Sequence, residues 1–526
     1  ASVSDLQNNK FSAVYVPTDS DTEGEAAFEI QFSDLAGNTG TPVTSSTNNT
    51  KVIFDKTDPA DFTVGLLTPT GGNQVADFWN LTNTGMDIIV PVANDTTLKN
   101  GTVQLYAKIG SNSFEPLGDV STILSTEINT DKTISITGDL IEGITGFAEG
   151  ETIYIKAEMN DRPGNSKEGS QSITEILIDE TPASITPIAI ISNNDNTALA
   201  KVGDTVTVSF TTSEILIDTT VSISGQSATI TGLGSNQFKA EYEMANGDPE
   251  GVIEFQISFI DVQGNPLAGT NATTDGTQVT FDRTKPTLDP VIITSDNSCS
   301  VGSIAKADNI ITINFTSLEP LLSTFSIVMG DTISVTDLGS SQYKIDHQLT
   351  DTDEEGNVSF LIRVTDLAGN LSENIITTTD NSNVEFDITK PLLTNVHIES
   401  NNNYSSIAVL GDIATLTFEA SEPLSNTTVQ ISSSTVIATE SNGVYSASYT
   451  IQNSDIAVGG FLSFAIDFID CPGNVGITDS TTSDESFVSI DIGPPEMVSV
   501  KIFSSNQDSS WAKVDDSVFV YFVVNE

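Results

Sequence analysis

Three sequence patterns recur along this chain with a shared spacing of about 104 residues. The first is an alternating strand that ends in Asp before a Gly-Asn turn; its aspartates are Asp34, Asp161, Asp261, Asp366 and Asp470. The second is a strand followed by Asp and then Pro; its prolines are Pro59, Pro182, Pro286, Pro391 and Pro495. The third is a strand that ends in Glu; its glutamates are Glu214, Glu319, Glu422 and Glu526. Because three independent markers share one period, the chain is predicted to be a tandem array of repeats.

The repeat boundaries are predicted from the second pattern. Proline fixes φ and cannot donate to a β-ladder, so it closes the last strand of one domain before the next begins. The predicted segments are a C-terminal half-repeat at 1–58, a repeat with an insertion at 59–182, complete repeats at 183–286, 287–391 and 392–495, and an N-terminal half-repeat at 496–526.

Within 183–286 the pattern indicates about seven short strands with period-2 alternation and turn residues between them. The apolar faces of the second and sixth strands, B and F, are expected to form the core; they carry Val206, Val208 and Phe210, and Phe255, Ile257 and Phe259. A solenoid would repeat every 20 to 50 residues or so and would lack a seven-strand pattern, so the spacing argues against it. The predicted fold class is all-β, with tandem seven-strand immunoglobulin-like sandwiches in an elongated array.

The two terminal segments each match only part of a repeat. Ala1 aligns with Ala228 in the middle of a sandwich, and Glu526 aligns with Glu214. Neither half is expected to bury a two-sheet core alone. Two explanations stay open: the sequence is a window of a longer polypeptide, or the tail half of one subunit completes the head half of the next in a head-to-tail polymer.

Acidic residues outnumber basic ones 72 to 19, which gives a formal net charge of −53. This charge argues against nucleic acid as a partner and disfavours an anionic membrane surface. It fits either a well-solvated surface or the binding of divalent cations. No apolar run is long enough to span a bilayer, and no signal-peptide core follows Ala1.

The sequence offers little for catalysis. His347 and His397 fall in different repeats with no triad or zinc-site arrangement around either, so both are predicted to be surface or strand residues. Cys299 and Cys471 also fall in different repeats, so neither can form a bridge within a domain, and the fold is not expected to rest on disulfides. The chain is therefore predicted not to be an enzyme.

The recurring acids are predicted to meet between neighbouring domains. In such a sandwich strands B and F end at the pole that faces the preceding domain, where that domain's strand G also ends. The converging sets are Asp179, Glu214 and Asp261; Asp282, Glu319 and Asp366; Asp387, Glu422 and Asp470; and the half-set Asp491 and Glu526. At the junction near Asp55, opposite Asp161, Asn94 and Asp95 stand in place of the Glu.

Three such carboxylates repel one another unless they are protonated or neutralised by a cation. Ca²⁺ takes six to eight oxygen ligands in flexible geometry and suits such a junction. A second interpretation is that the Asp at the end of strand F caps the following turn with its side chain, while the Glu residues are solvated strand ends. The two roles are compatible.

The DLAGN turns, the strand-Asp-Pro boundaries and the Gly-Asp strands ending in Ser-Glu resemble bacterial immunoglobulin-like, cadherin-like repeats of large surface adhesins and extracellular filament proteins. The resemblance covers essentially the whole chain. It implies calcium between the domains and a location that is secreted or on the cell surface.

The predicted function is a structural stalk or filament built from stiffened repeats. The alternative is an adhesin that binds a glycan or protein through one repeat. Residues 59–182 are the place to look, because the insertion falls there and Trp79 lies nearby.

Overall fold

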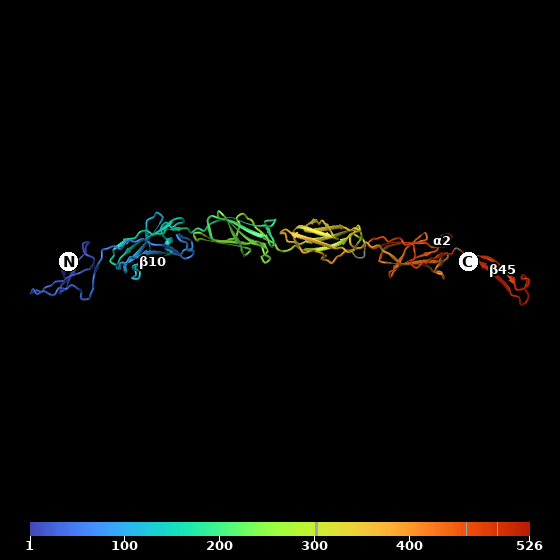
Figure 1. Cartoon of the computed structure of the whole chain (residues 1–526), viewed down its shortest axis with the longest axis horizontal. Helices are drawn as coiled ribbons and strands as arrows, with labels where there is room; N and C mark the ends of the chain where they lie inside the picture. Colours follow the sequence, from blue (N-terminus) through green and yellow to red (C-terminus); the bar gives the residue numbers. More distant parts are fainter. Residues whose placement is uncertain (300–302, 459, 492) are drawn as a thin grey trace. The chain divides into compact units, whose positions relative to one another are not determined.

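The structure, a computed structural model, describes residues 1–299, 303–458, 460–491 and 493–526. The chain divides into two compact units, Ala1–Asp282 and Arg283–Glu526. Nearly all regular structure is β-strand, and the sheets follow one another along the chain (Figure 1). The helical elements of the described residues are η1 (Thr96–Leu98), α1 (Gly138–Glu142) and α2 (Asn453–Val458). In this part of the chain no helix has the length and apolar character that crossing a bilayer requires.

The sandwich within 183–286 shows the architecture of one complete repeat. One sheet has the order β14-β16-β20-β19 and the facing sheet the order β18-β17-β22-β23. They correspond to strands A-B-E-D and C′-C-F of an immunoglobulin sandwich, with β23 as the first part of strand G and β24 as its last part. A third small sheet has the order β15-β24-β21. The strands are β14 (Ile185–Ser192), β15 (Leu199–Ala200), β16 (Thr205–Thr212), β17 (Leu216–Ile223), β18 (Gln226–Ser227), β19 (Thr229–Gly234), β20 (Gln237–Glu243), β21 (Gly251–Val252), β22 (Phe255–Asp261), β23 (Pro266–Thr270) and β24 (Thr280–Phe281). The predicted fold class of tandem immunoglobulin-like sandwiches is confirmed.

The core of this sandwich forms as the alternation predicts. Successive side chains of a strand point to opposite faces of the sheet, so one apolar face of β16 and one of β22 meet between the two sheets. The buried residues of these faces are Val206, Val208 and Phe210, and Phe255, Ile257 and Phe259.

The second unit contains two sandwiches with the same strand order. In the first, the sheets are β25-β27-β31-β30, β29-β28-β33 and β26-β34-β32; in the second, they are β35-β37-β41-β40, β39-β38-β43 and β36-β44-β42. The first has β25 (Leu288–Ser295), β26 (Ile304–Ala305), β27 (Ile310–Ser317), β28 (Leu321–Val328), β29 (Asp331–Ile333), β30 (Thr336–Gly339), β31 (Gln342–Gln348), β32 (Gly356–Asn357), β33 (Phe360–Asp366) and β34 (Glu385–Phe386). The second has β35 (Leu393–Ser400), β36 (Ile407–Ala408), β37 (Ile413–Ala420), β38 (Leu424–Ile431), β39 (Ser434–Val436), β40 (Thr439–Ser441), β41 (Val444–Thr450), β42 (Gly460–Phe461), β43 (Phe464–Asp470) and β44 (Ser489–Ile490).

The sandwich within 59–182 departs from this pattern by a longer β8–β9 hairpin and by the helix α1. Its sheets have the orders β10-β7-β5 and β6-β13-β11-β8-β9, and β12 pairs with β11. The strands are β5 (Leu67–Thr70), β6 (Phe78–Trp79), β7 (Gly85–Pro91), β8 (Thr102–Ile109), β9 (Glu115–Thr122), β10 (Asp131–Thr137), β11 (Thr152–Asn160), β12 (Ser166–Glu168) and β13 (Ile176–Ile178). Trp79 is completely buried in its core and its indole N–H donates to Glu180. Trp79 is therefore a core residue, and the suggestion that it marks a binding surface is wrong.

The terminal segments carry few strands, and their apolar side chains are exposed. The first has β1 (Ser2–Asp5), β2 (Phe11–Val14), β3 (Gly24–Glu25) and β4 (Ile53–Phe54); the last has β45 (Met497–Ser504) and β46 (Val518–Val524). Phe11 is 65% exposed and Phe522 is 60% exposed. The segment boundaries predicted from the sequence remain predictions.

Candidate metal centre

One predicted set of acids comes together in the second unit, between its two sandwiches. Asp387 follows β34 of the first sandwich, Glu422 lies between β37 and β38 of the second, and Asp470 ends β43. Ligand atoms of the three carboxylates all lie within 4.8 Å of one another. The end of one sandwich and two strand ends of the next thus converge on one point.

Asp470 has two oxygen atoms with different surroundings. Oδ1 accepts hydrogen bonds from the backbone N–H groups of Gly473 (2.7 Å) and Asn474 (2.6 Å), which caps the F–G turn. Oδ2 is buried and has no hydrogen-bond partner among the described residues. Turn capping therefore occupies one oxygen of this carboxylate and leaves the other facing the acidic set.

The turn is tied back to the preceding sandwich by its asparagine. The Asn474 side-chain amide donates to the backbone carbonyl of Asp387 at 3.0 Å. No hydrogen bond joins this amide to Oδ2 of Asp470 in the described part of the chain. In the turn that follows Asp366, by contrast, the Asn370 amide donates to Asp366 Oδ2 at 2.9 Å.

Burial, together with the neighbouring acids, raises the pKa of two carboxyl groups in this set. Burial, followed by the charges of Asp387, Asp470 and Glu355, raises the pKa of Glu422 to about 7. Burial is also the largest cause that raises the pKa of Asp387 to about 6. At pH 7 Asp387 is therefore mostly ionised and Glu422 is about half protonated, so the acids of the set still repel one another.

Glu355 is a fourth acid of this junction that the sequence analysis missed. Its carboxylate accepts from the backbone N–H groups of Ile388 and Thr389, both at 3.2 Å, and from the Thr389 hydroxyl at 2.9 Å. The hydrogen bond from Thr389 is the main reason that the pKa of Glu355 is lowered. A signal was present, because a Glu-Gly pair precedes strand F at the repeat spacing; its glutamates are Glu23, Glu149, Glu250 and Glu355.

The first unit contains the corresponding junction with Asp179, Glu214 and Asp261. Asp261 is completely buried; its Oδ1 accepts from Asn265 N–H at 2.8 Å, and its Oδ2 has no hydrogen-bond partner among the described residues. Burial, and then the charge of Glu149, raises the pKa of Asp179 to about 6. Burial and the charge of Asp261 raise the pKa of Glu214. The set interacts electrostatically, although its ligand atoms do not form a group as close as that around Asp470 in the described chain.

Asn265 links the sandwiches of the first unit. Its side-chain amide donates to the backbone carbonyl of Asp179 at 3.0 Å, and its side-chain oxygen accepts from Leu81 N–H at 2.9 Å. Beside it, the Asn73 amide donates to the Gly264 carbonyl at 2.8 Å. Gly264 has φ +97°, and a side chain there would also collide with Asn80. The F–G turn of one sandwich therefore packs against the loop after strand A of the preceding sandwich.

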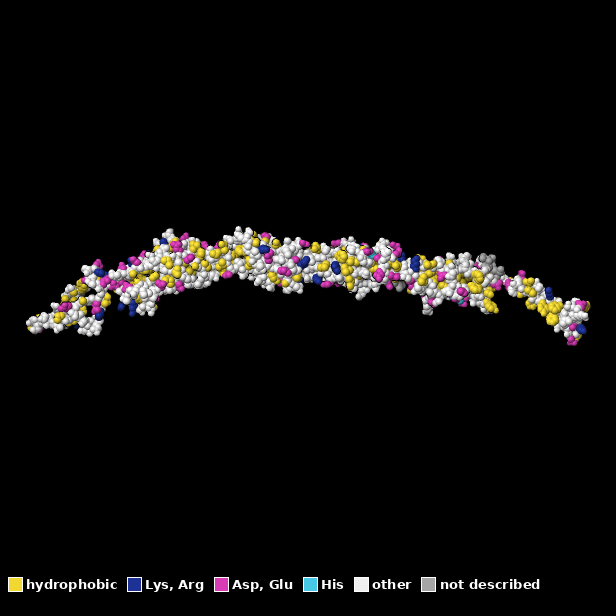
Figure 2. Space-filling model, viewed as in Figure 1, with side chains coloured by type: hydrophobic (Ala, Val, Ile, Leu, Met, Phe, Trp, Pro, Cys, Tyr) yellow, Lys and Arg dark blue, Asp and Glu magenta, His cyan; other side chains and the backbone are white. Residues whose placement is uncertain are grey.

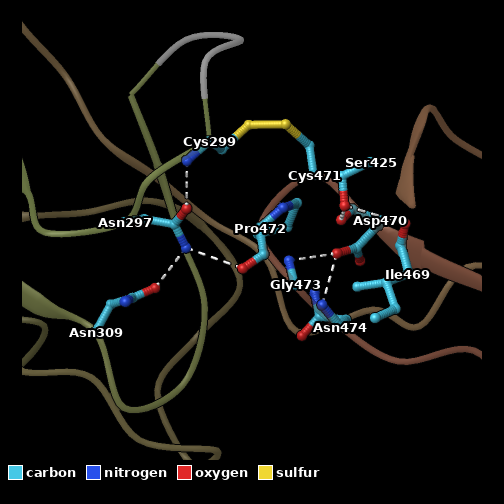
Figure 3. The surroundings of a disulfide bond; sticks show 10 residues. All are labelled: Asn297, Cys299, Asn309, Ser425, Ile469, Asp470, Cys471, Pro472, Gly473 and Asn474. Carbon is cyan, nitrogen blue, oxygen red and sulfur yellow. Dashed lines mark hydrogen bonds between the residues drawn. A yellow bond between two sulfur atoms is a disulfide. The ribbon is translucent and has the colours of Figure 1, made fainter.

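In the second unit a covalent bond joins the corresponding F–G turn to the loop after strand A of the preceding sandwich. Cys299, in the loop after β25, forms a disulfide with Cys471, which directly follows Asp470 (Figure 3). The Asn297 amide also donates to the Pro472 carbonyl at 2.9 Å (Figure 3). The sequence analysis excluded a bridge within one repeat and did not assign the two cysteines a role. The bond instead joins successive sandwiches, so it adds a link between domains and does not hold one domain together.

The remaining predicted residues are not shown to form complete sets of three acids within one unit of the described chain. Asp282 ends the first unit while Glu319 and Asp366 lie in the second, so this set stays a prediction. Asp491 follows β44 and Glu526 is exposed; the structure groups neither with a third acid among the described residues.

At the junction near Asp55, the backbone carbonyl of Asp55 accepts a hydrogen bond from the Asn165 side-chain amide at 3.3 Å. The Oδ2 atom of Asp55 is buried and has no hydrogen-bond partner in the described part of the chain. Asp161 caps its own turn through Gly164 and Asn165, both at 2.7 Å. Asp95 caps η1 through Thr97 N–H at 2.8 Å.

The histidines differ from one another. His397 is 40% exposed and lies 2.6 Å from an oxygen of Asp484, as a surface residue would. His347 is a strand residue as predicted, but it is buried on β31 with Asp331 and Asp353 close to its ring. The sequence analysis expected no zinc-site arrangement around His347, and it missed these two carboxylates because neither is adjacent to the histidine in the sequence.

Acidic side chains are spread over the visible face of the molecule, with few Lys or Arg among them (Figure 2). Carboxylate oxygens, backbone carbonyls and water are the ligands that Ca²⁺ takes at about 2.3–2.6 Å. The unpartnered buried oxygen of Asp470, facing two further carboxylates, fits such an ion. The donor set contains only oxygen atoms.

No protein-family model matches the chain, and no curated protein matches it. Several solved structures are similar to it. One is a Ca²⁺-stabilized adhesin with which an Antarctic bacterium binds ice: 15% identity, 82% of this chain and 100% of that chain covered, TM-score 0.39. Another comes from a 1.5-MDa bacterial ice-binding adhesin: 14% identity, 60% and 100% covered, TM-score 0.34. A third is a tetra-tandem repeat from the extending region of a large adhesion protein: 16% identity, 82% and 99% covered, TM-score 0.29.

Proposed function

We propose that this chain is a non-enzymatic structural part of an extracellular stalk or filament, whose junctions are stiffened by Ca²⁺. The observation that carries the proposal is the buried Oδ2 atom of Asp470, which has no partner among the described residues and lies in a group with Asp387 and Glu422. A buried carboxylate oxygen without a partner is costly, and a bound cation removes that cost.

Calcium at such a junction would reduce the bending freedom between two neighbouring sandwiches. Asp387 belongs to one sandwich and Asp470 to the next, so an ion bound to both restricts the hinge between them. The ion also neutralises repulsion that would otherwise push the two strand ends apart. The protein's own residues contribute the alignment, because Asn474 holds the F–G turn against the Asp387 carbonyl.

The disulfide supports an extracellular location. Disulfides persist in oxidising compartments and are rare in the cytosol, where thiols are kept reduced. The bond between Cys299 and Cys471 restrains the same junction as Asp387 and Asp470. One junction therefore carries both a covalent link and a cation site.

The experiment is thermal unfolding of the oxidised chain with Ca²⁺, with a chelator, and with Mg²⁺ in place of Ca²⁺. We expect Ca²⁺ to raise the melting temperature, and Mg²⁺ to do so far less because it demands a stricter octahedral geometry. Small-angle scattering of the same samples should show a narrower distribution of interdomain distances with Ca²⁺. An unchanged melting temperature on adding the chelator would falsify the calcium proposal.

Adhesion through the sandwich within 59–182 is the second candidate. Three aromatic rings on the outward face of β8, β11 and the hairpin lie under two ammonium groups: Lys108 is 5.0 Å from the Tyr154 ring, and Lys156 is 4.6 Å from the Phe114 ring. Aromatic faces of this kind can stack on a ligand. Glycan-array binding of the chain, compared with Tyr154→Ala, tests this candidate, and an empty array in both excludes a glycan ligand.

The exposed apolar strands of the terminal segments need a covering partner. In β45 and β46 the side chains of Val500 and Phe522 are 57% and 60% exposed. Further chain of the same polypeptide, or a second copy joined head to tail, would cover them. Sedimentation of the chain over a range of concentrations distinguishes the two.

A further inference from the structure

The sandwich within 287–391 contains a His-Asp-Asp cluster that belongs to no repeat junction. His347 lies near the end of β31, Asp353 in the loop that follows it, and Asp331 at the start of β29. One ligand atom of each lies within 4.8 Å of the others. The His347 side chain is only 6% exposed, and its Nε2 has no hydrogen-bond partner among the described residues.

Other repeats show what normally fills this position. Tyrosine occupies the place of His347, and its hydroxyl donates to the aspartate six residues later: Tyr15 to Asp21 at 2.6 Å, Tyr242 to Asp248 at 3.2 Å, and Tyr449 to Asp455 at 2.8 Å. In each of these loops the aspartate also accepts from a backbone N–H. The tyrosine and the aspartate thus satisfy each other.

The 287–391 sandwich keeps the aspartate and loses the tyrosine. Asp353 Oδ2 still accepts from Thr350 N–H at 2.6 Å, as its counterparts do. The distance from His347 Nε2 to Asp353 Oδ2 is 3.9 Å, which is too long for a hydrogen bond. His347 and Asp353 are therefore separated at the position where the tyrosine and the aspartate of those repeats form a direct hydrogen bond.

A second change occurs at the same place. In the following repeat, Ser434 occupies the position of Asp331 at the start of the paired strand and contacts Tyr449. Only in the 287–391 sandwich do a histidine and an additional carboxylate replace this tyrosine and serine. Both replacements provide metal ligands.

We propose that His347, Asp353 and Asp331 bind a divalent transition-metal ion of the Zn²⁺ class. Zn–N and Zn–O bonds are about 2.0–2.2 Å, so two ligands of one tetrahedral ion lie about 3.4 Å apart. The 3.9 Å between His347 Nε2 and Asp353 Oδ2 is too long for a direct hydrogen bond and needs only a small side-chain movement to reach that spacing. An imidazole nitrogen with two carboxylate oxygens selects zinc-like ions over Ca²⁺, which prefers oxygen ligands alone. Exposed Asp331 leaves a side open for water as a further ligand.

The test is Zn²⁺ titration by calorimetry in saturating Ca²⁺, which fills the acidic junctions, with Co²⁺ absorption as a second readout. His347→Tyr is the matched variant, because it restores the tyrosine that three other repeats have at this position and should restore the bond to Asp353. We expect the parent chain to bind one Zn²⁺ that His347→Tyr binds at least 100-fold more weakly, and Asp331→Ser to weaken the same site at least tenfold.

His397→Gln, at the exposed histidine, should leave this binding unchanged. The melting temperature of each variant in Ca²⁺ shows that the sandwich is folded. Equal Zn²⁺ affinity in the parent and in His347→Tyr, or no Zn²⁺ binding by the parent, overturns the proposal. Neither result bears on the calcium junctions, because Ca²⁺ is saturating throughout.

Discussion

Cys299 and Cys471 are joined by a disulfide, although they lie 172 residues apart and in successive sandwiches. Cys299 follows strand A of the first sandwich, and Cys471 precedes the segment that forms strand G of the second. Tension that enters along strand A can therefore pass through the sulfur atoms and leave along strand G. The residues between the two cysteines are excluded from this path.

Single-molecule pulling should show that the force passes through the disulfide and bypasses the residues between the two cysteines. Each residue extends by about 3.3–3.6 Å, so the closed loop hides on the order of 600 Å of chain. With the disulfide intact, the pair of sandwiches should release only a short length. Addition of reductant, or the double variant Cys299→Ser/Cys471→Ser, should restore two full unfolding events. Identical extensions in oxidised and reduced chains would show that the bond lies outside the load path.

Asp470→Asn should remove much of the calcium response of the second unit. Asparagine keeps an oxygen that can cap Gly473 and Asn474, but it removes the charge that faces Asp387 and Glu422. Ligand at 100 times its Kd stabilises by about 2.7 kcal/mol, or on the order of 10 °C in a domain of this size. We expect that shift to be largely lost, with an unchanged or higher melting temperature in chelator.

The control for this variant is Asp337→Asn, which changes the same charge in an exposed turn where Asp337 accepts from Gly339 N–H at 2.7 Å. It should keep the full response to Ca²⁺. A calcium shift retained in Asp470→Asn would place the ion elsewhere.

Without Ca²⁺, stability should fall as the pH rises from 5 to 7.5. The pKa of Asp387 is raised to about 6 and that of Glu422 to about 7, against ordinary values of 3.8 and 4.5. Above pH 4.5 the folded chain therefore holds protons that the unfolded chain has released, which makes stability decrease with pH through this window. Carboxyl groups whose pKa is lowered are already ionised there and do not contribute.

Chemical denaturation at several pH values in chelator measures this slope. Glu422→Gln should make it shallower, because the group with the highest pKa at the junction no longer titrates. Saturating Ca²⁺ should remove most of this slope, since the ion displaces those protons and leaves the carboxyl groups ionised in both the folded and the unfolded chain. A flat profile in chelator contradicts the electrostatic account of the junction.

Asn265→Ala should loosen the junction of the first unit. The side chain bridges Leu81 N–H and the Asp179 carbonyl, and leaving such buried groups unpaired costs about 1–3 kcal/mol. Hydrogen exchange at the Leu81 amide reports the bridge directly and should become faster. Asn193→Ala, in a loop within one sandwich, is a control that should leave Leu81 unaffected. Unchanged protection of Leu81 would mean that Asn265 does not hold the sandwiches together.

The local features of this protein could be predicted from its sequence. The alternation in β16 and β22 predicts which side chains are buried, because in a strand the facing of each residue depends only on its position. The recurring Asp before a Gly-Asn turn predicts the capping that Asp470 shows, since the bonds span only a few residues. The repeat spacing predicts tandem sandwiches, because each period contains a complete set of strands.

Only the tertiary structure decided which distant residues meet. It paired Cys299 with Cys471, brought Glu355 to the linker at Thr389, buried Trp79, and placed Asp331 beside His347. These contacts depend on how successive sandwiches dock and how loops fold over the ends of the sheets. Neither is encoded in a two-residue alternation or a repeat period, so the sequence could predict the strands but not the partners at their ends.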